Sequence, residues 1–324
     1  MDGEVRGSAV TEPLWEERRP RLGAMGPVRV RVPAKINLHL GVGPLRDDGY
    51  HELVTIYHAI GLFDEISARA ADTLALTMDG EGAGELALDD SNLVIRAVKV
   101  LAAATGREPH ARLHLRKQIP LAAGLAGGSA DAAATLVACD ALWATGLHRE
   151  ELAEIAAQLG SDVPFLVMGG TALGLGRGEQ VTPVLAPGQH WHWVVAVADG
   201  GLSTPEVYRE LDRLRADGSA PAPAGGTDEL VAALRQRDAT VLAEHLVNDL
   251  QPAAVSLRPS IAATLRVGAE AGSLAALVSG SGPTCVFLCK DGVSAEKVAG
   301  ALNDSGTCRA ARTATGPVPG ARLI

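Results

Sequence analysis

A glycine-rich loop that leads directly into an alanine-rich segment is the stretch of this sequence best suited to chemistry. Residues 120–136 read PLAAGLAGGSADAAATL, and the alanine run after Gly128 predicts a helix. The N-terminus of a helix carries unpaired backbone N–H groups and a partial positive charge, and both favour a phosphate group. Because glycine lets a backbone approach closely, the loop can wrap a polyphosphate, while the Ser129 hydroxyl can bind an oxygen or a magnesium ion.

The same loop also has a purely structural interpretation. Ser129 could cap a buried helix, and the glycines could form an ordinary turn. The density of glycine favours the phosphate loop. The sequence lacks GxxxxGK[ST], a GxGxxG after a strand, and the HRD and DFG motifs of protein kinases, so the better-known nucleotide loops do not apply.

Four other residues could do chemistry, and from the residues alone a structural role is favoured for each. Asp162 precedes Pro164 in SDVPF and is a suitable helix N-cap. Lys35 can be a solvated lysine at a strand end. His190 and His192 in HWHW lie at strand spacing, but two histidines without a third ligand make a weak metal site.

The first half of the chain is expected to begin as a sheet that positions these residues. Alternating apolar and polar residues predict strands at 28–42, 74–80 and 111–118. A helix is predicted at 91–106, with Ser91 or Asn92 as its N-cap and Gly106 as its stop. Beyond it the pattern predicts a helix in the alanine run, a helix at 149–160 and a return to strand at 166–184.

The second half is expected to be a layered α+β domain that starts near residue 185, where APGQ breaks the pattern. The pattern predicts strands at 192–199, around SGSGPT and near Arg312, and helices at 204–214, 227–236, 259–272 and 294–303. Residues 215–228 are rich in Ala, Pro and Gly and are expected to form a mobile surface loop. The predicted organisation is a disordered extension at 1–26 and domains at 27–185 and 186–324.

Composition and charge argue against several classes of function. The 324 residues are 47% hydrophobic, and a chain of this length favours two domains. The formal net charge of −9 argues against nucleic acid and an anionic membrane as partners. There is no apolar run of the roughly 20 residues that a membrane helix needs, and no signal-peptide core. The four cysteines form no CxxC pair and are expected to be reduced thiols of a cytoplasmic protein.

Three motifs in a fixed order give the sequence a specific resemblance. The glycine-rich loop at 120–136 resembles the central ATP motif of the GHMP kinases, a superfamily of small-molecule kinases, and LVSGSGPTCVFL at 277–288 resembles their third motif. VPAKINLHLGVGPLRDDGYHEL at 32–53 resembles the first motif of the branch that phosphorylates 4-diphosphocytidyl-2-C-methyl-D-erythritol. With GSDVPFLVMGGTALGLGRGE and HLVNDLQPAA, the resemblance runs from about residue 28 to the C-terminus.

The resemblance implies an α+β fold of two domains, the first similar to ribosomal protein S5 domain 2 and the second a ferredoxin-like layered domain. It implies a cytoplasmic kinase, monomer or homodimer, that uses ATP and Mg²⁺ to phosphorylate the 2-hydroxyl of this cytidine-diphosphate-linked methylerythritol in non-mevalonate isoprenoid biosynthesis. By the same resemblance Asp162 takes the hydroxyl proton, and Lys35 holds the aspartate ionised and orients the hydroxyl.

The resemblance also implies binding residues. Those for the nucleotide are Asn92, Lys117, Pro120, Gly124, Gly127, Gly128 and Ser129, of which Ser129 is also the candidate magnesium ligand. Those for the substrate are Asn37, Tyr50, His51, Thr204 and Tyr208, with the two tyrosines on opposite faces of the cytosine and His51 hydrogen-bonded to it. SGSGPT is expected to pack its glycines against the central loop, and Asp131 is expected to favour the helix dipole from the first turn.

Two other functions remain open from the sequence. One is another GHMP kinase, such as one acting on homoserine, which turnover with each alcohol would separate. The other is a noncatalytic module that binds a ligand or nucleic acid, because the expected N-terminal fold resembles a ribosomal-protein fold. The acidic charge and the presence of both Lys35 and Asp162 argue against the module.

Overall fold

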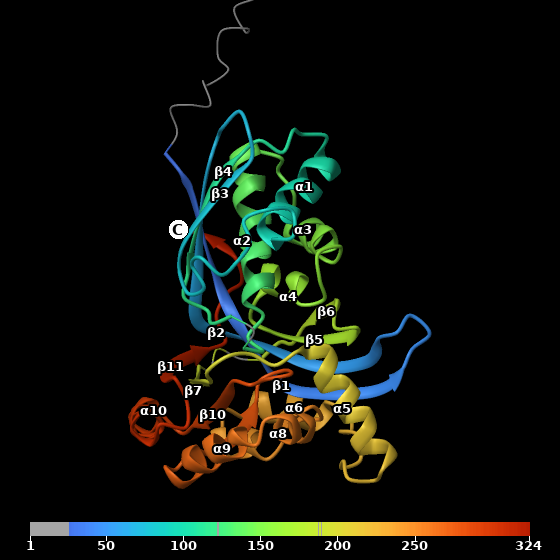
Figure 1. The fold of residues 1–324 in the computed structure, drawn as a ribbon, viewed down its shortest axis with the longest axis vertical. Coiled ribbons are helices and arrows are strands. Elements are labelled where there is room, and N and C mark those ends of the chain that lie inside the picture. The colour runs from blue at the N-terminus through green and yellow to red at the C-terminus, as the bar shows by residue number, and fades with distance from the viewer. Residues whose placement is uncertain (1–25, 122, 187, 189) are drawn as a thin grey trace, which may run out of the picture.

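Two long antiparallel strands, β1 (Val28–Leu45) and β2 (His51–Arg69), form the spine of the first sheet, and the turn between them projects from the side of the molecule (Figure 1). The computed structural model describes residues 26–121, 123–186, 188 and 190–324. The predicted strand at 28–42 is confirmed and is longer than expected. β2 is not predicted by alternation, because every side chain from 55 to 60 is buried and polar positions do not alternate with apolar ones there.

The first sheet has eight strands, and its central path runs in the order β12-β1-β2-β4-β3. A short hairpin, β5 with β6, joins the sheet along the other part of β2, and β8 pairs in parallel with β1. These strands are β3 (Ala75–Gly80), β4 (Arg112–Lys117), β5 (Thr171–Gly176), β6 (Gln180–Pro183), β8 (Val247–Asn248) and β12 (Arg322–Leu323). β12 and β8 come from the second half of the chain, so its end returns to the first sheet.

Four helices lie over one face of this sheet, two of them in contact with its strands and two packed on those helices (Figure 1). They are α1 (Leu93–Thr105), α2 (Gly127–Trp143), α3 (Arg149–Ala156) and α4 (Val163–Met168). The predicted limits of α1 are confirmed: the Asn92 side chain accepts the Val94 N–H as N-cap, and Gly106 ends the helix in the left-handed conformation. The predicted strand at 166–184 is wrong at its start, because residues up to Met168 belong to α4 and β5 begins only after two glycines.

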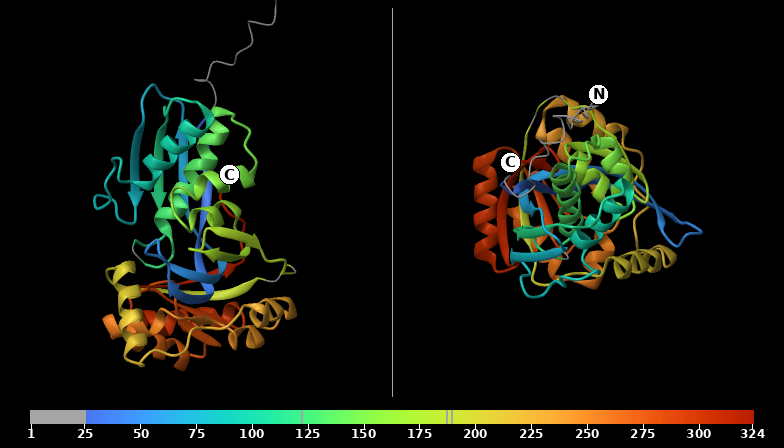
Figure 2. Two further views of the ribbon diagram at one scale, coloured as in Figure 1. Left: turned by 90° about the vertical axis from the view of Figure 1, so that its right-hand side faces the viewer. Right: turned by 90° about the horizontal axis from the view of Figure 1, so that it is seen from above.

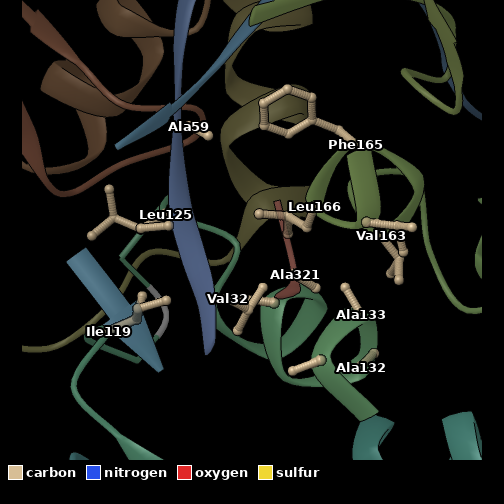
Figure 3. Packing of buried hydrophobic residues seen from close by; sticks show 14 of the residues in the cluster. Val32, Ala59, Ile119, Leu125, Ala132, Ala133, Val163, Phe165, Leu166 and Ala321 are labelled. Atoms are coloured by element: carbon tan, nitrogen blue, oxygen red, sulfur yellow. The ribbon is translucent and has the colours of Figure 1, made fainter. Parts of the chain in front are cut away.

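The core under these helices is built from small and branched side chains (Figure 3). Ala132 and Ala133 of α2 are fully buried, and so are Val32 of β1 and Phe165 and Leu166 of α4. Because alanine has so short a side chain, α2 can lie close to both the sheet and α4. The alanine run therefore places the N-terminus of α2 firmly against the sheet.

The second sheet has the order β11-β7-β10-β9 and, with its helices, forms the lower layer in Figure 1 and in the left view of Figure 2. Its strands are β7 (Trp191–Val197), β9 (Ala275–Val278), β10 (Cys285–Cys289) and β11 (Ala310–Gly316). The helices are α5 (Thr204–Ala216), α6 (Asp228–Gln236), α7 (Ala239–Ala243), α8 (Gln251–Leu257), α9 (Ser260–Glu270) and α10 (Gly292–Ser305). The four helices and the strand pair around SGSGPT that the sequence predicts are confirmed.

The stretch 215–228 of the second half was expected to form a mobile surface loop. The segment 217–227 that follows α5 is tied to the body of the protein, since the Ala224 N–H donates to the buried carboxylate of Asp249.

All four cysteines are free thiols, and all but Cys308 are buried. Within the described part of the chain, none of the helices has the length and apolar character needed to cross a bilayer.

Candidate active site

A cavity of about 820 Å³ lies where the helices of the first sheet face the second layer. Its wall includes Lys35 on β1, Asp162 before α4 and Tyr208 on α5. The glycine-rich loop with the first turn of α2 forms another part, and residues 280–282 of the β9–β10 turn complete it. The three sequence motifs therefore meet in one cavity.

The glycine-rich loop enters α2 through Ala126, which has a φ of 57° in the left-handed region. Ala126 is the N-cap and offers no side-chain hydrogen bond, so the N–H groups of the first turn are left without a side-chain cap. Ser129 lies inside this turn, so the interpretation of Ser129 as the N-cap is wrong. Gly127, Gly128 and Ser129 all line the cavity, as a loop that receives phosphate requires.

Gly124 fixes the loop against the β9–β10 turn. The Ser279 hydroxyl donates to the Gly124 carbonyl at 3.0 Å, and a Cβ at Gly124 would lie 2.0 Å from the Ser279 carbonyl oxygen. Gly124 also has a φ of 73°, so a glycine is required there for both reasons. The expected packing of SGSGPT against the central loop is confirmed.

Asp162 and Lys35 lie beside each other on the cavity wall, with the Lys35 Nζ 3.7 Å from Asp162 Oδ2. Asp162 occupies the N-cap position of α4 but makes no side-chain cap hydrogen bond. Its carboxylate is therefore free to act in the cavity, where 28% of the side chain is exposed, whereas Lys35 is buried. In this arrangement the carboxylate can accept a proton, and the ammonium group can neutralise a developing negative charge.

Lys35 is held in place by a chain of buried hydrogen bonds. Its Nζ donates to Asn37 Oδ1 at 2.9 Å, Asn37 Nδ2 donates to Thr55 Oγ1 at 2.7 Å, and that hydroxyl donates to the His39 carbonyl. Register shifts in the β1–β2 pairing on both sides of Lys35 aim this segment into the cavity. Asn37, expected near the substrate, therefore also orients the lysine.

Tyr57 forms a further wall beside this pair, and the sequence did not single it out. The Lys35 Nζ lies 5.6 Å from the centre of the Tyr57 ring, which stacks on Phe165. Burial, followed by the charge of Asp162, raises the pKa of the Tyr57 phenol well above its usual value, so the phenol stays protonated. A side chain at Gly178, in the turn after β5, would collide with Tyr57, because a Cβ there would lie 2.2 Å from the Tyr57 hydroxyl. The closely spaced glycines of β5 and this turn are the feature of the sequence that could have indicated a bulky residue beside them.

His51 and Tyr208 come together at the other end of the cavity. Their rings stack with centroids 5.1 Å apart and planes inclined by 25°. His51 Nε2 lies 3.0 Å from Asp212 Oδ1, one helical turn after Tyr208 on α5. Asp212 was missed in the sequence, although its spacing from Tyr208 places both on one face of a helix.

The remaining expected substrate residues also lie on the cavity wall. Tyr50 is 55% exposed and has the Arg177 guanidinium 5.0 Å above its ring, a contact that the sequence did not predict. Thr204 begins α5 and its hydroxyl lies 2.8 Å from that of Ser281. Both expected tyrosines thus border the same space as His51.

Three residues expected at the nucleotide do not line this cavity. Asn92 caps α1 and also donates from Nδ2 to the Ala87 carbonyl. Pro120 is buried, and the Lys117 ammonium is buried between Asp64 and Asp131. Asp131 lies beyond the first turn of α2 and is buried in this pair, so the expectation that it favours the helix dipole from the first turn is wrong.

Among the described residues, no group of three or more His, Cys, Asp or Glu side chains is arranged to hold a metal ion. His192 lies on β7 within the second sheet, away from the cavity wall. Ser129, the candidate magnesium ligand, lies on the cavity wall.

Comparison with known proteins defines the class to which this fold and cavity belong. The family model described as GHMP kinases N terminal domain matches residues 92–170, and the model described as GHMP kinases C terminal matches residues 230–308. A relative from Salinispora tropica is 72% identical over 308 residues, 95% of this chain and 98% of the relative. The chain therefore belongs to the GHMP kinase family, and the expected two-domain α+β fold is confirmed.

The relatives carry one particular name. The protein from Salinispora tropica is named 4-diphosphocytidyl-2-C-methyl-D-erythritol kinase, as is one from Rhodococcus jostii that is 56% identical over 92% of this chain and 95% of its own length. A crystal structure of 4-(cytidine 5'-diphospho)-2C-methyl-D-erythritol kinase matches with a TM-score of 0.72 and 31% identity, over 89% of this chain and 98% of that one.

A second solved structure shows how widely the fold is shared. The homoserine kinase from Cytophaga hutchinsonii matches with a TM-score of 0.70, over 93% of this chain and 98% of that one. Its sequence identity is only 18%, so this likeness supports the fold alone.

Proposed function

We propose that this chain is an ATP-dependent kinase that phosphorylates the 2-hydroxyl of 4-diphosphocytidyl-2-C-methyl-D-erythritol, a step of non-mevalonate isoprenoid biosynthesis. The relatives at 52–72% identity that bear this kinase's name support the activity. The observation that carries the proposal is one cavity that joins the phosphate loop, the Lys35–Asp162 pair and the His51–Tyr208 stack. In this order, the loop would bind the nucleotide, the Lys35–Asp162 pair would contact the reacting hydroxyl, and the His51–Tyr208 stack would bind the base of the substrate.

Phosphoryl transfer needs an alcohol in line with the γ-phosphorus of ATP and charge neutralisation around the phosphoryl oxygens. Asp162 accepts the proton from the 2-hydroxyl as the new O–P bond forms. Lys35, fixed by Asn37 at 2.9 Å, orients the hydroxyl oxygen and balances the negative charge. Tyr57 excludes water from one side of the pair.

The nucleotide phosphates bind at the N-terminus of α2. Gly127, Gly128 and Ser129 present backbone N–H groups there, and Gly124 sets the path of the loop. Asn92 and Pro120 are proposed to shape the site from its edge. Mg²⁺ would be held mainly by the ATP phosphates, with the Ser129 hydroxyl as the ligand from the protein, and would neutralise phosphate charge.

The cytosine binds where His51 and Tyr208 are stacked. We propose that the base inserts beside Tyr208, with Tyr50 on its other face and His51 hydrogen-bonded to its polar edge. Asp212, at 3.0 Å, holds the His51 ring and selects its tautomer. Asn37 and Thr204 then contact the methylerythritol portion between the base and the reacting hydroxyl.

We further propose that the enzyme works in the cytoplasm, as a monomer or a homodimer, and binds no nucleic acid. The net charge of −9 supports the last of these proposals, because a phosphate backbone is repelled by an acidic surface. Analytical ultracentrifugation with and without substrate would decide the oligomeric state.

The proposed function is tested by Mg²⁺-dependent ADP release from purified protein with ATP and each of three alcohols. We expect turnover with the cytidine-linked methylerythritol and none with homoserine or mevalonate. Asp162→Asn protein prepared in parallel is the control for a contaminating kinase. Turnover with homoserine alone would refute the proposed substrate, and ATP binding without turnover of any alcohol would favour a noncatalytic module.

A further inference from the structure

Three charged side chains lie buried together beneath the phosphate loop. The Lys117 Nζ donates to Asp64 Oδ2 at 2.7 Å and to Asp131 Oδ2 at 2.8 Å. The side chains of Lys117 and Asp64 are 0% exposed, and that of Asp131 is 4% exposed. The proposed reaction uses none of the three, although they come from β2, β4 and α2.

Stability alone is a poor explanation for this cluster. Taking ionisable groups out of water costs free energy, and apolar residues of similar volume often stabilise a core as well or better. Among the described residues Asp131 Oδ1 has no hydrogen-bond partner, so one buried oxygen is unsatisfied. Burial raises the pKa of Asp131 well above its usual value, against the opposing charge of Lys117. The arrangement is costly in free energy and therefore points to another role.

The cluster holds both ends of the phosphate loop. At the start, Asp64 Oδ1 accepts the N–H groups of Gln118 and Ile119, the latter at 2.8 Å. At the end, a Cβ at Gly127 would lie 3.1 Å from the Lys117 Nζ, so the first turn of α2 packs directly on the ammonium group. The loop between these two points has its Gly124 pinned separately by Ser279.

We infer that Asp64, Lys117 and Asp131 form a positioning network that holds the phosphate loop in its ATP-binding conformation without touching the nucleotide. The expected direct contact between Lys117 and ATP is replaced by this indirect role, because the ammonium is buried and bonded to two carboxylates. The network acts by preorganisation: it sets the directions of the backbone N–H groups before ATP arrives. This inference rests on the proposed function only in taking the loop as the ATP site.

Asp64→Asn tests the network, because an amide nitrogen must then face either the Lys117 ammonium or the two loop N–H groups. We expect the dissociation constant for ATP, measured by calorimetry, to rise about tenfold, the loss of roughly one charge-assisted hydrogen bond. Affinity for the cytidine-linked methylerythritol is expected to stay unchanged. Amide hydrogen exchange at 118–129 is expected to accelerate.

Asp249→Asn is the matched control. Asp249 is also a buried carboxylate that accepts two backbone N–H groups, those of Val42 and Ala224, and pairs with Arg215, but it lies outside the phosphate loop. We expect it to lower the melting temperature while ATP affinity and hydrogen exchange at 118–129 stay as in the wild type. A network with a merely structural role would make the two variants behave alike.

Asp131→Asn keeps the experiment decisive if Asp64→Asn does not fold. It replaces the buried carboxyl group by a neutral amide of nearly the same shape and retains an oxygen that accepts from Lys117, so the fold is expected to survive, with about a threefold rise in the ATP dissociation constant. Wild-type ATP affinity and wild-type exchange at 118–129 in the folded variants would overturn the inference. Wild-type protein that binds ATP but does not phosphorylate the methylerythritol would refute the proposed substrate and leave the network testable.

Discussion

Replacing Asp162 by asparagine should remove the proposed base and leave helix α4, which begins after it, intact. The Asp162 side chain makes no cap hydrogen bond to α4, and its nearest cationic partner, the Lys35 Nζ, is 3.7 Å away. Because the carboxylate is partly exposed, this pair is screened, and the free energy of unfolding should change by less than about 1 kcal/mol. The variant is therefore expected to fold and to bind both substrates.

The expected loss is in turnover. General base catalysis by a positioned carboxylate contributes about 10²- to 10⁴-fold, equivalent to about 3–5 kcal/mol in activation free energy. Asparagine has nearly the same volume as aspartate and cannot accept the proton, so kcat should fall by this factor. The KM values for ATP and for the alcohol should stay within about threefold of the wild type, because the binding surfaces are unchanged.

The assay is steady-state ADP release by Asp162→Asn, Lys35→Met and the double variant. Since Lys35 and Asp162 act on the same hydroxyl, the double variant should lose about as much activity as the more damaged single variant, which is non-additive behaviour. Asp212→Asn is the matched control: it removes another carboxylate of the cavity, and it should raise the KM for the alcohol more than it lowers kcat.

Two results would refute this reasoning. If kcat of Asp162→Asn stays within about fivefold of the wild type, Asp162 is not the base. If the losses of Lys35→Met and Asp162→Asn add fully in the double variant, the two residues act independently. In either case the 3.7 Å approach of Lys35 to Asp162 would be structural.

Three further predictions follow from contacts on the cavity and in the core. Tyr208→Ala should raise the KM for the alcohol about 5- to 100-fold, the worth of one base–aromatic stack, with the KM for ATP unchanged in steady-state kinetics; equal rises in both would contradict a base-binding role. Gly124→Ala places a Cβ 2.0 Å from the Ser279 carbonyl oxygen and should lower the free energy of unfolding, measured in urea, by at least about 2 kcal/mol. Gly146→Ala is the control, because Gly146 has a similar φ but lies in open space, so the substitution there adds only backbone strain. Burial lowers the pKa of His58 to about 3, so the unfolded chain binds the extra proton and stability is lost as pH falls from about 6.5 towards 3, by up to about 1.4 kcal/mol per pH unit. Thermal melts from pH 7 to pH 4 test this, since His58→Gln should flatten the profile and parallel curves would rule it out.

Local sequence patterns were sufficient where neighbouring residues decide the structure. The Asn92 cap and the Gly106 stop of α1 both follow from interactions within one or two turns of the chain. The sequence failed at β2, where burial on both faces removes the alternation, and at residues 166–168, which continue the helix that starts after Asp162. In both cases burial by distant segments outweighs the local pattern.

The identity and order of the motifs, and with them the phosphate loop, could be recognised from the sequence, because glycine spacing ahead of an alanine-rich helix is a local property. Which charged residues lie together depends instead on how distant segments of the chain pack. The Asp162 side chain makes no cap hydrogen bond at the start of α4 and lies near Lys35 instead, and the Lys117 ammonium is buried between Asp64 and Asp131. Such pairings depend on strands and helices far apart in the chain, and the packing of the sheet against α2 and α4, not any local propensity, brings these oppositely charged groups together.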